Sequence, residues 1–389
     1  MGKTLIKAGV LFTGEKDSQP AKGQYLVLNG NLIESVSDRQ PEGSFESVLD
    51  YSAKAVLPGI IDAHTHLAFN GHESLFKLYL DPRDKLCFEA VDSVRRTLLS
   101  GVTTCRDVGG FNFLDVSLKR FIDQGVLVGP RMFVSGKMIT ATGGHCHVIA
   151  TEANGPSEIR AAVREQIKNG ADMVKLMATG GGATPGQHLE AIQLELDEIK
   201  AATEVAHSNF RRVGAHAHGA AGIKRLVQGG IDIIDHGSLL DEDGAKMMAD
   251  NGVFLCITPG HESMFPNLDA DWKRRMMPLR SRAPKTIEIA KKHGVKMCMG
   301  TDSGGNPYAP HGKIHVCLEE FVKTGMSARE AIVCVTSMAA ECIGVQDRLG
   351  TIAPGKLADI AVFEGDPTRH IEDLARVAAV IKDGKLLGL

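Results

Sequence analysis

Short apolar runs alternate with amphipathic segments along most of the chain. Runs of strand length occur at residues 57–62, 101–107, 131–135, 171–178, 212–216, 231–235, 252–257 and 295–301. Segments with the apolar spacing of a helix lie between most of them, at residues 91–99, 114–124, 157–169, 195–207, 220–228, 242–251 and 284–293. Continuous apolar runs are typical of strands buried on both faces, so the pattern predicts parallel strands connected by helices.

Eight strands with intervening helices predict an α/β fold, a (β/α)8 TIM barrel. A doubly wound open sheet is the rival topology. That fold usually carries a Gly-x-Gly-x-x-Gly phosphate turn after its first strand, and the chain has none there. The glycines at 180–182 have the wrong spacing for this turn. We therefore favour the barrel.

Both ends of the chain are rich in short predicted strands, at residues 4–14, 24–36, 48–57, 349–363 and 377–386. Asn29 and Gly30 are typical of a hairpin turn, because both tolerate positive φ. A helix is predicted at residues 327–343, where Ser327 and Glu330 have the spacing of a capping box. The pattern thus predicts a barrel at 57–345 and one small β-sandwich domain built from 1–56 and 346–389.

The composition is that of an ordinary soluble protein. The 389 residues are 43% hydrophobic and carry a formal net charge of −3, which argues against nucleic acid or an anionic membrane as the main partner. No window reaches transmembrane length, and the N-terminus lacks an apolar run of signal-peptide length. The eight cysteines form no Cys-x-x-Cys pair, and most lie in apolar segments, as reduced core thiols do. We expect a cytoplasmic protein.

Lys175 lies in an apolar predicted strand that leads into a glycine-rich loop. An unpaired charged lysine is too costly to bury, so it needs a partner or a change of chemistry. A neutral lysine beside two metal ions can take up CO2 as a carbamate and become an anionic ligand with two oxygens. This hypothesis requires further ligands that converge on Lys175.

Candidate ligands follow several of the predicted strands. His64 and His66 are two apart at the end of the first barrel strand, where alternate residues share a face. His216, His236 and Asp302 each end a later strand. Barrel active sites lie at the carboxyl ends of the strands, and imidazole and carboxylate groups suit zinc or a similar divalent ion. The sequence therefore predicts a metal site there.

These residues and their surroundings resemble the amidohydrolase superfamily. The resemblance is strongest to its prolidase-like and imidazolonepropionase-related members, which act as Xaa-Pro dipeptidases or Xaa-Arg/Lys carboxypeptidases. It covers nearly the whole chain. The matching segments are 57–66 (LPGIIDAHTH), 101–107 (GVTTCRD), 129–131 (GPR), 142–145 (TGGH), the Lys175 strand, 215–217 (AHA), 235–237 (DHG), 300–302 (GTD) and 350–359 (GTIAPGKLAD).

The resemblance implies a two-metal site, with zinc as the expected ion. His64, His66 and Asp302 would hold one ion and His216 and His236 the other, with Lys175, carboxylated by CO2, between them. A hydroxide between the ions would be the nucleophile. Asp302 would act as general base and then as general acid. His145 would position the substrate carbonyl or the oxyanion.

Some features leave the substrate open. His218 competes with His216 for one ligand position, and its role is undetermined. Residues 257–261 (ITPGH) depart from the pattern of the prolidase-like members. The segment at 261–282 is either a lid and wall of the substrate pocket or a surface excursion, and its basic run at 273–275 is expected to be a solvated helix face. Arg106 and Arg131 lie near strand ends and are candidates to pair with a buried acid.

The resulting hypothesis is a metal-dependent hydrolase that cleaves the amide bond of a dipeptide or N-acyl amino acid. The alternative is a cyclic amidohydrolase that opens an imidazolone-like or hydantoin-like ring, because the metal residues are the same for both. A catalytically inert barrel is disfavoured, since every candidate ligand is present. The expected partners are a small-molecule substrate and further copies of the chain in a homo-oligomer.

Overall fold

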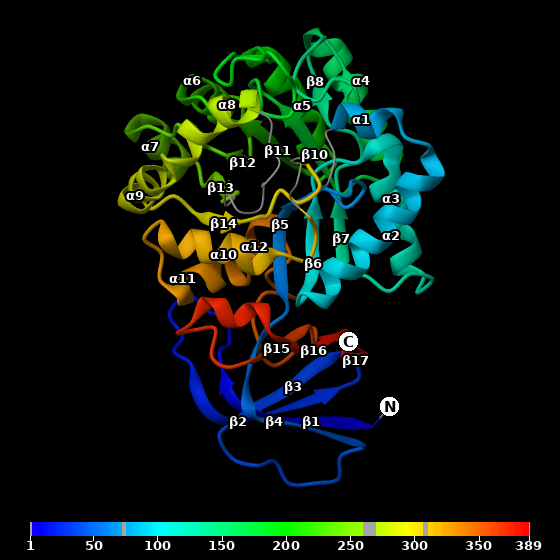
Figure 1. The fold of residues 1–389 in the computed structure, drawn as a ribbon, viewed down its shortest axis with the longest axis vertical. Helices are drawn as coiled ribbons and strands as arrows, with labels where there is room; N and C mark the ends of the chain where they lie inside the picture. Colours follow the sequence, from blue (N-terminus) through cyan, green and yellow to red (C-terminus); the bar gives the residue numbers. More distant parts are fainter. Residues whose placement is uncertain (1, 72–74, 260–269, 306–309, 389) are drawn as a thin grey trace.

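The computed structural model of the protein describes residues 2–71, 75–259, 270–305 and 310–388. It has two parts, which Figure 1 shows one above the other. The larger part contains parallel strands surrounded by helices. The smaller part is a sheet that contains strands from both ends of the chain.

The larger part contains two parallel sheets of buried strands. One has the order β5-β6-β7 and the other β14-β13-β12-β11-β10-β8-β9. The bounds are β5 Ile60–Thr65, β6 Val102–Asp107, β7 Arg131–Val134, β8 Ile139–Thr140, β9 Thr151–Glu152, β10 Met173–Met177, β11 Arg212–Ala217, β12 Ile233–His236, β13 Phe254–Ile257 and β14 Met297–Met299. Every residue of β5, β6, β10, β13 and β14 is buried. This agrees with the apolar runs and with burial on both faces.

Backbone hydrogen bonds connect the two parallel sheets at two places. Asp172, just before β10, donates its N–H to the carbonyl of Val134 in β7 (2.8 Å). On the other side, the N–H of Asp302 donates to the carbonyl of His64 (2.8 Å), and that of His66 to the carbonyl of Ser303 (2.9 Å). The arrangement is consistent with the predicted TIM barrel.

Helices surround these strands, most of them where the amphipathic pattern predicts them and three, at residues 75–80, 270–280 and 314–323, where it does not. Their bounds are α1 Leu75–Leu80, α2 Arg83–Leu99, α3 Leu114–Asp123, α4 Gly155–Lys168, α5 Leu196–Ser208, α6 Ala220–Gln228, α7 Glu242–Asp250, α8 Ala270–Arg280, α9 Ala283–His293, α10 Ile314–Lys323, α11 Ala328–Cys334 and α12 Ser337–Ile343. The apolar faces of most of them pack on the strands in one large cluster of buried residues, which includes Val94, Ile159, Ile199 and Leu226. The strand ends are thereby held in fixed positions.

The prediction of a single helix at residues 327–343 is wrong, because two helices occupy this segment. The predicted capping box is present: Glu330 N–H donates to Ser327 Oγ (3.2 Å), and Ser327 N–H donates to Glu330 (2.7 Å). The helix then breaks at Thr336, whose φ of −130° and ψ of −99° are not helical. The Val335 carbonyl there accepts the N–H of Ile61 in β5 (2.7 Å). The break thus fastens the segment to the first strand of the barrel.

The strands from the two ends form one sheet of order β17-β16-β15-β4-β1-β2-β3. Their bounds are β1 Lys3–Leu11, β2 Ala21–Asn29, β3 Leu32–Ser37, β4 Ser47–Pro58, β15 Ile360–Glu364, β16 Val377–Lys382 and β17 Lys385–Leu387. The predicted hairpin is confirmed: β2 and β3 are antiparallel, and Gly30 between them has a φ of +61°. A division of this sheet into the two layers of a sandwich stays a prediction, as do the domain limits.

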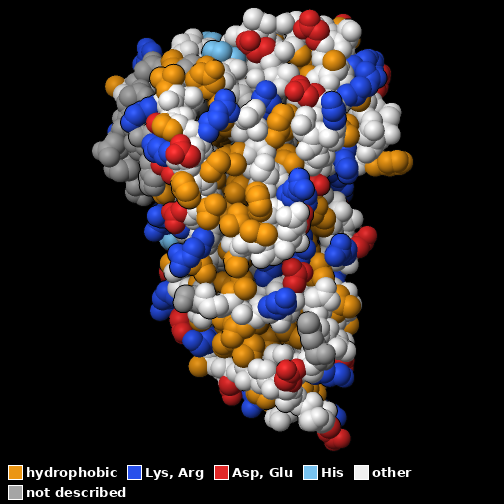
Figure 2. Space-filling view, turned by 90° about the vertical axis from the view of Figure 1, so that its right-hand side faces the viewer, with side chains coloured by type: hydrophobic (Ala, Val, Ile, Leu, Met, Phe, Trp, Pro, Cys, Tyr) orange, Lys and Arg blue, Asp and Glu red, His pale blue; other side chains and the backbone are white. Residues whose placement is uncertain are grey.

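Charged side chains of both signs are interspersed with hydrophobic ones over the face drawn in Figure 2, so no field of a single sign dominates it. Within the described ranges, no helix combines the length and the apolar character that crossing a membrane requires.

Candidate metal centre and active site

One pocket at the carboxyl ends of the central strands contains every predicted site residue. We call the side chains that these strand ends contribute the floor: His64, His66, Lys175, His216, His236 and Asp302. His145, from the loop after β8, lines the same pocket. Residues up to 238 positions apart in the sequence therefore meet here, as the barrel hypothesis requires.

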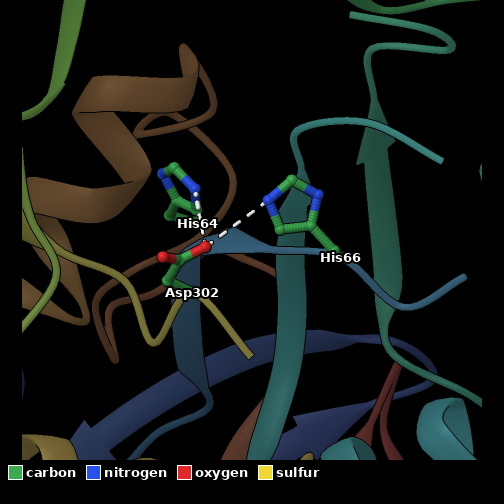
Figure 3. A group of neighbouring side chains, drawn as sticks. All are labelled: His64, His66 and Asp302. Atoms are coloured by element: carbon green, nitrogen blue, oxygen red, sulfur yellow. Dashed lines mark ion pairs between the residues drawn. The ribbon is translucent and has the colours of Figure 1, made fainter. Parts of the chain in front are cut away.

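His64, His66 and Asp302 converge most closely (Figure 3). Asp302 Oδ1 lies 3.3 Å from His64 Nε2 and 3.5 Å from His66 Nε2. One ligand atom from each of the three lies within 4.8 Å of the other two. His66 is held from behind, because its Nδ1 lies 2.8 Å from the carbonyl of Gly109. A histidine fixed through one nitrogen with the other facing a carboxylate is the arrangement of a metal ligand.

The backbone just before Asp302 lies very close to strand β5. A side chain at Gly300 would overlap the backbone and Cβ of His64, so only glycine fits there. The next residue, Thr301, donates its N–H (3.0 Å) and its hydroxyl (2.6 Å) to the buried carboxylate of Asp62. Asp62 also accepts the N–H of His64 (3.2 Å). One carboxylate thus ties the loop of Asp302 to the strand that carries both histidines.

His216 and His236 form the opposite side of the floor. Their ring centroids are 4.7 Å apart, and the His236 ring is 5.0 Å from that of His64. His236 Nδ1 lies 2.7 Å from Thr258 Oγ1, and His216 Nε2 lies 3.1 Å from the carbonyl of Gly180. His218 is also in the pocket, with its Nδ1 2.9 Å from Ser238 Oγ. The position of His218 leaves its role open.

Two of the floor residues have a backbone conformation that side chains rarely adopt. His236 has a φ of +71° and Asp302 a φ of +56°. Neither is glycine, so each position stores local strain that the surrounding structure has to offset. Such strain concentrates at functional sites, where it directs a side chain to a required place.

Lys175 has the partner that its burial demands. Its Nζ forms an ion pair with Asp235, and the guanidinium of Arg106 pairs with the same carboxylate. His64 Nδ1 lies 3.1 Å from Asp235 Oδ1. The expectation that Arg106 pairs with a buried acid is confirmed. Arg131 does so as well, 3.5 Å from the buried Asp359 and 2.6 Å from Asp383.

Asp235 was not assigned a role from the sequence, although it stands next to His236. Beneath the floor it joins Arg106, Lys175 and His64 in one buried network. Cys256 is also missed: its sulfur, with His64 and Asp235, forms a second group of ligand atoms within 4.8 Å. The signal for Asp235 was an acidic residue inside an apolar strand, which requires a buried cation.

Burial and charge set the protonation of the floor. Burial lowers the pKa of His216 and His236 well below the usual value, and it lowers those of His145 to about 3 and His218 to about 4. For His64, burial also lowers the pKa, but the charge of Asp235 and the hydrogen bonds to Asp235 and Asp302 together outweigh burial and raise the pKa to about 10. Neutral imidazoles and an ionised carboxylate are the forms that bind divalent metals, so His216 and His236 are in the ligand form, whereas His64 has to release a proton when metal binds.

Burial alone would raise the pKa of Asp302, but hydrogen bonds from His64 and His66 lower it well below its ordinary value. Asp302 is therefore a carboxylate at neutral pH. Burial lowers the pKa of Lys175, which favours the neutral amine. The donor set thus fits a divalent cation.

Helix α8 lies beside the pocket and contributes what we call the wall: Met276, Leu279 and Arg280. Residues 261–269 of the segment predicted as a lid lie outside the described residues. Arg274 in the basic run is exposed, as predicted for a solvated face. Arg275 differs, because it is half-buried and donates to the carbonyl of Gly182 (3.1 Å) in the loop after β10. The wall is thereby attached to that loop.

Comparison with known proteins agrees with this geometry. Residues 55–387 match the profile of the amidohydrolase family. Ochratoxinase from Aspergillus niger is 28% identical over 428 residues, which cover 98% of this chain and 86% of the relative. Imidazolonepropionase from Brucella suis is 26% identical over 373 residues, which cover 87% of this chain and 86% of the relative.

The solved structures that resemble this chain include a Xaa-Pro dipeptidase with bound methionine in its active site. That structure has a TM-score of 0.91 and 32% identity, with 99% of both chains covered. A prolidase complexed with N-methylphosphonate-L-proline has a TM-score of 0.89 and 30% identity, again with 99% of both chains covered. The chain therefore belongs to the amidohydrolase family and is a hydrolase that acts on carbon–nitrogen bonds.

Proposed function

We propose that the protein hydrolyses the amide bond of a dipeptide or an N-acyl amino acid with the help of bound divalent metal. The observation that carries this proposal is the convergence of His64, His66 and Asp302, within 4.8 Å, in a chain of the amidohydrolase family. The resemblance to a Xaa-Pro dipeptidase and a prolidase supports this class of substrate.

The floor residues divide into two candidate metal positions. His64, His66 and Asp302 would hold one zinc ion, and His216 and His236 a second. Lys175 lies in the same pocket, and as a carbamate formed with CO2 it would join them. When bound, such ions polarise a carbonyl and lower the pKa of water. Arg106 is placed to balance the added negative charge, because it already pairs with Asp235 beside Lys175.

Asp302 is the residue that moves the proton in this proposal. It is ionised at neutral pH, since His64 and His66 lower its pKa well below the usual value. It can therefore accept a proton from the attacking water and return it to the leaving nitrogen. An amide nitrogen is a poor leaving group until it is protonated, so the second transfer matters as much as the first.

His145 is suited to position the substrate carbonyl. Thr184 Oγ1 accepts the N–H of Cys146 (2.9 Å) and lies 3.0 Å from His145 Nδ1. A hydroxyl that donates to Nδ1 leaves the hydrogen of the neutral imidazole on Nε2. Burial keeps this ring neutral, with a pKa of about 3. Nε2–H can then donate to a carbonyl oxygen as negative charge develops on it.

A cyclic amidohydrolase is the second candidate, favoured by the similarity to imidazolonepropionase over 87% of this chain. It would use the same floor and open a ring without releasing a fragment.

We also propose a closed barrel with a small sandwich domain, a cytoplasmic location and a homo-oligomeric state.

The test measures amino-acid release by zinc-loaded protein from a pooled library of dipeptides and N-acyl amino acids. Asp302→Asn should reduce kcat/KM by about 100- to 10,000-fold, because it removes the proton acceptor. Asp347→Asn is the matched control, since Asp347 is exposed and does not line the pocket. If the metal-loaded protein releases no amino acid from any member of the library, the proposal is rejected. Cyclic amides are then the next substrates to assay.

A further inference from the structure

Helix α2 presents an exposed stripe of side chains to solvent. Asp84, Phe88, Val91 and Arg95 follow one another at intervals of four, three and four residues, so they lie along one face of the helix. All four are exposed, and Phe88 at the centre is 77% exposed. The opposite face of α2 packs into the large core, for example through Val94. The stripe therefore contributes an aromatic side chain to the surface instead of to the fold.

Exposed apolar side chains also lie on the elements next to α2. Phe121 of α3 is exposed, and so are Val126 and Val128 in the loop that follows it. This loop lies between the two helices, because a Cβ at Gly129 would meet side chains of both α2 and α3. Hydrophobic side chains gather in the middle of the face drawn in Figure 2, on the side of the molecule where α2 and α3 lie in Figure 1. Apolar patches of this kind mark interaction surfaces.

The two ends of the stripe carry opposite charges. Among the residues that the structure describes, Asp84 and Arg95 form neither an ion pair nor a side-chain hydrogen bond. Asp92 and Arg96, which lie beside the stripe, differ in this respect, because they pair with each other at 2.5 Å. The charges of the stripe are thus available to a partner, whereas their neighbours on the helix are already neutralised.

The stripe is complementary to itself when two copies of α2 pack antiparallel. A twofold axis midway between Phe88 and Val91 places Phe88 opposite Val91 of the partner subunit and Asp84 opposite Arg95 of the partner subunit, since both pairs have the same midpoint. Each contact occurs twice, as a closed dimer requires. Apolar contacts then occupy the centre and ion pairs the rim, the arrangement found in protein interfaces. Parallel packing would instead bring like charges together.

We propose that α2 is a dimerisation surface, on which a second copy of the chain docks through its own α2 in the antiparallel direction. The occupant is a second copy because each position of the stripe is matched by a complementary position at the same distance beyond its midpoint. This inference rests on the proposed homo-oligomeric state and specifies the surface that forms it. The pocket has no part in it, so its test does not depend on amide hydrolysis.

Sedimentation equilibrium of the full chain over a range of concentrations measures the dissociation constant of the dimer. Phe88→Asp should raise this constant by about 100-fold, because it places two charges in the apolar centre of the interface. An assembly larger than a dimer should fall to half its mass or less. Phe210→Asp is the matched control, since Phe210 is a fully exposed phenylalanine beyond the end of α5 and should leave the assembly unchanged.

An exchange of charges tests the antiparallel register. Asp84→Arg places like charges opposite each other at both ends of the interface and should weaken the dimer about tenfold. Arg95→Asp should have the same effect through paired carboxylates. The double variant Asp84→Arg/Arg95→Asp restores opposite charges, so its dissociation constant should return to within about threefold of the wild-type value.

A wild-type protein that stays monomeric at every concentration overturns the inference, as does an assembly that folded Phe88→Asp leaves intact. A double variant that is as weak as the single variants rejects the antiparallel pairing. Circular dichroism shows whether each variant is folded, and if Phe88→Asp is not, the exchange of charges decides. Amide hydrolysis is assayed separately, so a dimer without activity rejects only the proposed function.

Discussion

The floor and the wall of the pocket are built in different ways. The floor side chains come from the ends of buried strands, and hydrogen bonds or ion pairs hold Lys175, His66 and His236 from behind. The wall belongs to α8, whose buried side chains form a small cluster of their own with Leu189, apart from the large core. We therefore expect the chemistry to depend on the rigid floor and the selectivity to depend on the wall, which can change without disturbing the floor.

Among changes to the floor, Lys175→Ala is expected to have the largest effect on stability, metal content and activity. In the metal-free protein, where Lys175 carries no CO2 and pairs with Asp235, the change removes one cation from the buried network of Asp235 and Arg106, which should cost about 3–5 kcal/mol of unfolding free energy. Bound metal and activity should both be lost, because the proposed bridging ligand is absent. Denaturant unfolding, metal analysis and amide hydrolysis measure the three effects.

The control for this variant is Lys224→Ala, which removes an ion pair with Asp241 at the surface and should leave metal and activity intact. Partial recovery of the activity of Lys175→Ala by a short-chain carboxylate would support the carbamate. Full activity of Lys175→Ala without any addition would contradict it.

A smaller effect is expected from Gly181→Ala, in the loop that connects the floor to the wall. A Cβ at this position would overlap the imidazole of His145, so the ring has to move. Misplacement of a positioning group by about 1 Å can cost about 100-fold, so we expect kcat to fall by that order while metal content is retained.

Gly388→Ala makes the same change where a Cβ meets no neighbour, and should have no effect. Unchanged kcat in Gly181→Ala would show that the position of His145 does not matter for the reaction.

The parallel strands and the floor could be predicted from the sequence because each depends on local signals. The apolar runs located the central strands within a few residues, and strand ends placed His64, His216 and Asp302 at the same edge. The break at Thr336 could not be predicted, because it depends on a hydrogen bond from Ile61, which is distant in the sequence. A capping box and an apolar periodicity do not report such a contact.

The residues that pair with buried charges could not be identified from the sequence either. The apolar surroundings of Lys175 indicated that a partner was needed, but Asp235 is 60 residues away and became identifiable only in the structure. The segment at 261–282 was predicted to be either a lid or a surface excursion, but Arg280 itself could not be singled out, because an arginine near the end of a polar helix is usually solvated. Its place in the pocket follows from the way α8 packs through Trp272, Met276 and Leu279.

The smallest effect is expected from Met276→Ala, which changes the wall and leaves the floor residues as they are. Met276 lines the pocket and would meet any side chain at Gly182, and its buried apolar neighbours are Leu189, Trp272 and Leu279 and no floor residue. Loss of its apolar surface should raise KM for an apolar substrate by about tenfold, the equivalent of about 1.4 kcal/mol, with kcat and metal content unchanged.

Met326→Ala is the matched control for Met276→Ala. Met326 is buried in the large core and does not line the pocket, so its loss should lower the thermal unfolding midpoint and leave KM unchanged. If Met276→Ala instead reduces kcat or releases metal, floor and wall form one unit. The selectivity of the pocket could then not be altered through α8 without loss of the chemistry.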